Sequence, residues 1–155
     1  MWTEAIPTWT EQYNKYFKVN RYPMKEAHLK KFCFALDLKD DAEAINTYQE
    51  YHKAVWPEIN QSLKDSGIVN AEIYNTGNRL FMIIEAAPDF SIAQKSQMDQ
   101  NNPRVQAWEN LMWEFQQALP HAPQGTKWVL MEKIYDLNDQ VSSPTPKSDK
   151  NDAKK

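Results

Sequence analysis

The order in which hydrophobic periodicity changes along the chain constrains the fold more than any other feature of the sequence. In residues 31–38 apolar side chains recur at every second position, which is the pattern of a β-strand. Residues 69–75 and 80–86 predict two further strands, joined by turn-forming residues at positions 76–78. Residues 127–137 alternate again, and they predict a final strand.

Helical sequence fills the two long intervals between these strands. The first interval predicts a helix over residues 42–55, begun by two aspartates that can cap it. A second helical segment follows, in which Pro57 suits the first turn and which runs to residue 65. The last interval, residues 91–119, predicts a helix interrupted at the pair Asn102-Pro103.

The resulting order, β-α-β-β-α-β, has few topological solutions. Right-handed crossovers arrange it as a four-stranded antiparallel sheet with helices on one face, which is a ferredoxin-like α+β sandwich. The strands carry apolar residues on both sides, so we expect something to cover the other face of the sheet. A second copy of the chain is the expected cover, giving a homodimer of the dimeric α/β barrel type.

The two ends of the chain differ in composition from this central domain, residues 31–137. Residues 1–30 are rich in aromatic side chains, and we expect an ordered N-terminal arm there. Residues 138–155 are almost entirely polar, so they predict a disordered tail with nothing to bury. The sequence therefore predicts one folded domain with two unlike extensions.

Composition excludes several classes of protein. Eighteen basic residues against 21 acidic ones leave a net charge of −3, without the clustered positive charge that nucleic-acid binding needs. No run approaches the roughly 18 apolar residues of a membrane span. The single cysteine, Cys33, excludes an intramolecular disulfide and a cysteine-based zinc site. The N-terminal sequence lacks the features of a signal peptide, so we expect a cytoplasmic protein.

His52 is the candidate catalytic residue, because His28 and His121 lie in segments expected to be exposed. At helical spacing it shares one face of its helix with Tyr48 and with other apolar residues, namely Ile45, Val55, Trp56 and Ile59. A buried histidine satisfied by its tyrosine neighbour would explain this pattern. An acid/base pair in a pocket is the other explanation, which spacing alone favours less, since imidazole exchanges protons near pH 7.

Three separated segments of the chain resemble the L-rhamnose mutarotase family, which includes L-fucose mutarotases. The resemblance covers residues 31–137, and its segments are Tyr48-x3-His52-x3-Trp56-Pro57-Glu58, residues 71–82, and residues 105–112 followed by Leu119-Pro120. It implies a homodimeric barrel that interconverts the anomers of a 6-deoxyhexose without a cofactor, L-rhamnose first and L-fucose second. It also implies that His52 is the principal acid/base and that Tyr48 is its neighbour.

One departure from the family concerns the wall on which the sugar would stack. The rhamnose enzymes carry a Trp-Trp pair where this chain has Trp108-Glu109, and Trp113 lies one helical turn later as a substitute. Trp56 and Trp108 offer flat faces to a deoxyhexose, although core packing would explain each of them equally. The remaining candidates for contact with sugar hydroxyl groups lie around the hairpin: Tyr74 and Arg79.

Two other functions fit the same architecture. Dimeric α/β barrels also include haem-binding proteins and cofactor-free monooxygenases, and a helix histidine can be an axial iron ligand. A non-catalytic sugar-binding dimer would use the same aromatic and polar groups. The sequence therefore predicts a mutarotase and leaves these two alternatives to be tested.

Overall fold

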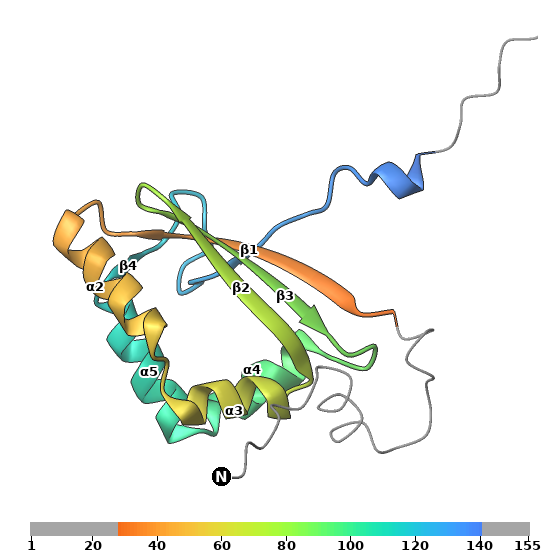
Figure 1. The fold of residues 1–155 in the computed structure, drawn as a ribbon, viewed down its shortest axis with the longest axis horizontal. Helices are drawn as coiled ribbons and strands as arrows, with labels where there is room; N and C mark the ends of the chain where they lie inside the picture. The colour runs from red at the N-terminus through yellow and green to blue at the C-terminus, as the bar shows by residue number, and fades with distance from the viewer. Residues whose placement is uncertain (1–27, 141–155) are drawn as a thin grey trace, which may run out of the picture.

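The computed structural model describes residues 28–140 of the chain. It confirms a mixed α+β domain in which helices lie on one side of an antiparallel sheet (Figure 1). The elements are, in order, β1 (Lys30–Leu38), α2 (Ala42–Lys53), α3 (Pro57–Asp65), β2 (Ile68–Thr76), β3 (Arg79–Ala86), α4 (Ile92–Gln100), α5 (Pro103–Trp113), β4 (Gln116–Gln117), β5 (Val129–Leu130) and a 3-10 turn, η1 (Leu137–Asp139).

The sheet has the order β2-β3-β1-β4, and β5 pairs with β1 as well. The β1–β3 ladder is antiparallel throughout and runs from the pair Lys30↔Ala86 to the pair Asp37↔Arg79. The β2–β3 hairpin closes through residues 77 and 78, and Gly77 adopts the positive φ of 53° that its turn requires. These pairings agree with the predicted ferredoxin-like fold.

The helices begin where their capping residues predict. The Asp41 carboxylate accepts a hydrogen bond from the Ala44 amide at the start of α2, at 2.8 Å. The Asn102 side chain accepts from the first amides of α5, and the following proline occupies the first turn, so the predicted interruption is confirmed. Pro57 likewise opens α3.

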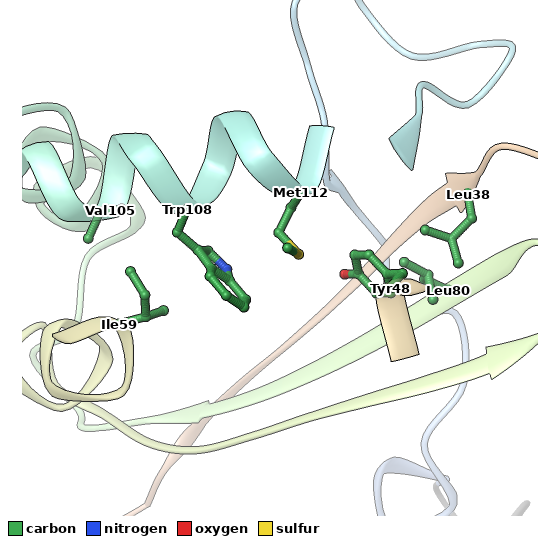
Figure 2. Close-up of a cluster of buried hydrophobic side chains, with 7 residues drawn as sticks. All are labelled: Leu38, Tyr48, Ile59, Leu80, Val105, Trp108 and Met112. Carbon is green, nitrogen blue, oxygen red and sulfur yellow. The ribbon is translucent and has the colours of Figure 1, made fainter. Parts of the chain in front are cut away.

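A hydrophobic core between the sheet and the helices holds the two layers together. Figure 2 shows α5 directing Val105, Trp108 and Met112 toward Ile59 of α3 and Tyr48 of α2. From the sheet, Leu38 and Leu80 complete the same cluster of buried side chains. The core thus lies directly beneath the face of α2 that carries Tyr48.

Two element boundaries were predicted wrongly. The last helix ends at Trp113 rather than at residue 119, because the chain turns back to the sheet edge and Gln116 and Gln117 pair with β1 as β4. The final strand comprises only Val129–Leu130 instead of residues 127–137. Met131 donates one more backbone hydrogen bond to Cys33, at 2.8 Å, and beyond it the chain leaves the sheet.

The two predicted extensions are only partly described. The expected N-terminal arm, residues 1–30, falls almost wholly outside the described residues. The disordered tail was expected from residue 138, but the first two of its residues belong to η1, Leu137–Asp139. In this turn the Asp136 carboxylate accepts a hydrogen bond from the Asn138 amide. Among the described residues, no helix has the length and apolar character needed to cross a membrane.

Candidate active site

The candidate site is centred on one face of α2, where Tyr48 and His52 are one helical turn apart. Their ring centroids are 4.2 Å apart and the rings are tilted by 33°. Tyr48 is 3% exposed, whereas His52 is only half-buried and keeps access to solvent. The helix therefore places a buried phenol directly beside an accessible imidazole.

The hydrogen bond of His52 determines which of its ring nitrogens can act as a base. Nδ1 lies 2.8 Å from the backbone carbonyl oxygen of Tyr48. A carbonyl oxygen can only accept, so Nδ1 carries the proton and Nε2 keeps a free lone pair. Burial lowers the pKa of His52, and it outweighs the opposing effect of this hydrogen bond. His52 is thus neutral at pH 7, with Nε2 ready to accept a proton.

The hydroxyl group of Tyr48 is held by a residue that sequence reasoning missed. Gln116, 6% exposed in β4, directs its side-chain amide toward the Tyr48 oxygen at 3.4 Å. Burial raises the pKa of Tyr48 to about 12, although the hydrogen bond from Gln116 lowers it in part. The phenol therefore keeps its proton at neutral pH. Gln116 was missed because its segment was predicted to be helix.

Trp108 forms an aromatic wall beside His52. Its ring centroid lies 5.7 Å from that of His52 in an edge-to-face arrangement. Trp56 packs edge-on against Trp108 at 5.1 Å, and Tyr51 does so from another side at 6.2 Å. The two predicted tryptophans and His52 are thus brought together. Tyr51 was not predicted, although its spacing of three residues from Tyr48 was a signal that could have found it.

The outer side of this wall carries a charged pair. The Arg104 guanidinium lies 4.1 Å from the centre of the Trp56 ring, and its Nε is 3.5 Å from the Glu58 carboxylate. A guanidinium stacked on an indole holds that ring in place. The orientation of Trp56 is therefore supported by contacts with both Trp108 and Arg104.

Trp113 does not join this cluster. It is partly exposed, and the Lys127 ammonium lies 5.2 Å from the centre of its ring. Between the two candidates for the aromatic wall, the structure brings Trp108, not Trp113, to His52.

Tyr74 and Arg79 also lie apart from His52. Leu36 and Leu38 are buried in the core, so the alternation of β1 directs Asp37 to the opposite face of the sheet. Arg79 is paired with Asp37 in register and binds its carboxylate through two nitrogens, at 2.8 and 3.1 Å. Tyr74 shares that face, opposite Phe81. Sugar binding by these two residues stays a prediction, and within one chain it would not involve the His52 site.

Taken together, fold and site define a ferredoxin-like α+β protein with a neutral histidine, a buried tyrosine and a tryptophan wall suited to proton transfer on a small polar molecule. A family model described as L-rhamnose mutarotase matches residues 31–137. The chain belongs to the L-rhamnose mutarotase family.

Individual relatives agree with this family assignment. An L-fucose mutarotase of Xanthomonas campestris pv. campestris is 42% identical over 116 residues, covering 74% of this chain and 93% of that protein. An L-rhamnose mutarotase of Phocaeicola vulgatus is 29% identical over 92 residues, covering 59% of this chain and 85% of the relative. A crystal structure of an L-rhamnose mutarotase from Formosa agariphila shares the fold, with a TM-score of 0.52 at 24% identity over 70% of this chain and 98% of its own. These matches do not favour the haem-binding or monooxygenase alternatives.

Proposed function

We propose that this protein interconverts the α and β anomers of a 6-deoxyhexose, L-rhamnose or L-fucose, by acid/base opening and closing of the sugar ring. One observation carries the proposal: the Nδ1 hydrogen bond of His52 leaves Nε2 as a free base, next to a phenol that keeps its proton. Ring opening requires this pair of functions, a group that accepts a proton and a group that supplies one.

The reaction can be written with all protons balanced. Nε2 of His52 accepts the proton of the C1 hydroxyl as the bond between C1 and the ring oxygen breaks, and C1 becomes an aldehyde. The Tyr48 hydroxyl supplies a proton to the ring oxygen. After rotation about the C1–C2 bond, closure reverses both transfers and restores His52 and Tyr48 to their starting states. Trp56, which is half-buried, provides an apolar face for the C–H side and the methyl group of the sugar, and Trp108 supports it from the core.

The choice between the two sugars depends on the named relatives and on one position where this chain differs from the rhamnose enzymes. The sequence resemblance alone placed L-rhamnose first, but the higher identity is to a protein named as an L-fucose mutarotase. The resemblance implies that the rhamnose enzymes carry a second tryptophan at the position of Glu109, so we expect the wall of this site to differ from theirs. These two points favour L-fucose as the better substrate, with L-rhamnose as the second candidate.

The test is NMR saturation transfer between the two anomeric protons of each sugar, measured with and without protein. The native chain should accelerate exchange, and His52→Gln should reduce that acceleration roughly 10²-fold or more, because an amide cannot exchange protons near neutral pH. His121→Gln is the matched control, since His121 is exposed and lies outside the site.

Two results would count against the proposal. If a folded His52→Gln variant kept full activity, His52 would be a packing residue and the mechanism would be wrong. If neither sugar showed accelerated exchange although one of them bound, the chain would be a sugar-binding protein rather than a mutarotase. A homodimer and a cytoplasmic location stay predictions of the sequence.

A further inference from the structure

The hydroxyl group of Tyr48 has one hydrogen-bond partner within residues 28–140, the side-chain amide of Gln116. Nε2 of Gln116 donates to the Tyr48 oxygen at 3.4 Å, and both side chains are buried. An amide nitrogen can only donate, so the phenol oxygen accepts in this bond and its own proton is not used. The direction of the bond therefore leaves the Tyr48 proton available for another acceptor.

The backbone of the sheet, rather than the side chain alone, fixes the position of Gln116. Gln116 pairs with Leu38 in antiparallel register, and directly opposed residues of two strands face the same side of a sheet. Leu38 lies in the same buried cluster as Tyr48 (Figure 2). One residue earlier, the Phe115 carbonyl accepts a hydrogen bond from the Lys39 amide at 2.8 Å. The ladder thus presents the amide of Gln116 to the helix that carries Tyr48.

The bond between Gln116 and Tyr48 should strengthen during the reaction. When the O–H bond of Tyr48 breaks and the sugar ring oxygen takes the proton, negative charge remains on the phenol oxygen until ring closure returns that proton. A hydrogen bond to an ionised acceptor is roughly twice as strong as one to a neutral acceptor. An interaction that is stronger in the transition state than before it accelerates the step. Consistently, the bond from Gln116 lowers the pKa of Tyr48, although burial outweighs it and raises that pKa to about 12.

We propose, on the basis of the proposed function, that Gln116 is a positioning residue for proton transfer by Tyr48. Its amide keeps the phenol oxygen as an acceptor within the protein, so that the Tyr48 proton is directed to the sugar. The same amide stabilises the phenolate that remains after the transfer. Gln116 acts through Tyr48 and needs no contact with the sugar. A group that could only accept at this position would instead take the Tyr48 proton and disable the acid.

The first variant removes the donor and keeps the length of the side chain. Gln116→Met should lower kcat for anomer exchange roughly 10–10²-fold, the contribution of a hydrogen bond to a charged group, with KM changed less than about twofold. Both constants come from saturation transfer measured across a range of sugar concentrations and corrected for the folded fraction. Gln117→Met is the matched control, because Gln117 is the exposed neighbour in β4 and should leave both constants unchanged.

The second variant reverses the direction of the hydrogen bond as the pH rises. In Gln116→Glu the protonated carboxyl group can still donate to the Tyr48 oxygen, whereas the carboxylate can only accept and takes the Tyr48 proton. The exchange rate should therefore fall as the pH rises through the pKa of this carboxyl group, which is ordinarily about 4.3 and is raised by burial. The native chain lacks such a decline near neutral pH, because Tyr48 keeps its proton. His52, which packs against Tyr48, titrates in both proteins, so the difference between the two profiles reports the new group.

Two results would overturn the role of Gln116. One is a Gln116→Met variant with the native kcat, whether or not KM rises. The other is a Gln116→Glu variant whose pH profile runs parallel to the native profile, and this shape does not depend on the amount of folded protein. Either result leaves the activity of the native chain in place, so it is distinct from failure of the proposed function. A native chain without accelerated exchange would overturn both.

Discussion

Removing the Tyr48 hydroxyl tests the proposed proton transfer most directly. Tyr48→Phe deletes one oxygen and leaves the ring in place against His52. If that hydroxyl supplies the proton to the ring oxygen, anomer exchange should fall by roughly 10²–10⁴-fold, the usual contribution of a positioned acid or base. The assay is the same saturation transfer, corrected for the fraction of folded protein.

The same substitution has a cost in stability that follows from the surroundings of the hydroxyl. Gln116 is buried, and its amide loses its partner on Tyr48 when the oxygen is removed. Leaving a buried donor unpaired costs about 1–3 kcal/mol of unfolding free energy. This is measured by urea denaturation at one fixed protein concentration, because association changes the apparent stability.

A double-mutant cycle separates the hydrogen bond from the catalytic effect. Gln116→Leu in the Tyr48→Phe background removes the unpaired amide, so the double variant should lose less than the sum of the single losses, with a coupling of about 0.5–3 kcal/mol. Tyr51→Phe is the control for loss of a phenol, because within residues 28–140 the Tyr51 hydroxyl has no hydrogen-bond partner. Additive losses would refute the bond to Gln116. Undiminished exchange by Tyr48→Phe would refute the role of the hydroxyl.

Three further predictions concern charge, sheet and helix. Burial lowers the pKa of His52 from its usual 6.5, so Nε2 becomes protonated only at a lower pH. The acid limb of the exchange rate should therefore have its midpoint below pH 6.5, and a midpoint above that value would contradict the burial argument. Arg79→Met should lower the unfolding free energy by leaving the Asp37 carboxylate unpaired, yet should not alter exchange, and reduced exchange would show that Arg79 does serve the site. Asp41→Ala removes the cap of α2 and should cost about 1 kcal/mol in urea denaturation, whereas Asp41→Asn should retain most of that stability.

The local features of this protein could be predicted from its sequence, because they depend on near neighbours in the chain. A capping aspartate and a proline determine where α2 and α3 begin, whatever the rest of the chain does. The fixed turn of an α-helix places Tyr48 and His52 on one face, so the centre of the site was predictable as well. The antiparallel arrangement of the main strands followed from the same local patterns together with the handedness of crossovers.

The remaining parts of the site were decided by tertiary structure, because they depend on which distant segments meet. Gln116 reaches Tyr48 across 68 residues, only because the chain after α5 turns back to the edge of β1. The packing of α5 on the core selects Trp108 over Trp113 as the neighbour of His52. The register between β1 and β3 makes Asp37 the partner of Arg79, on the face of the sheet away from the helices. The alternation of residues 127–137 gives a strand only where the backbone can pair with a neighbouring strand. In the described residues this pairing, with β1, is made by Val129–Leu130 alone. Periodicity determines which way a side chain faces along its own element, but the partner of that face is determined by the packing of the whole domain.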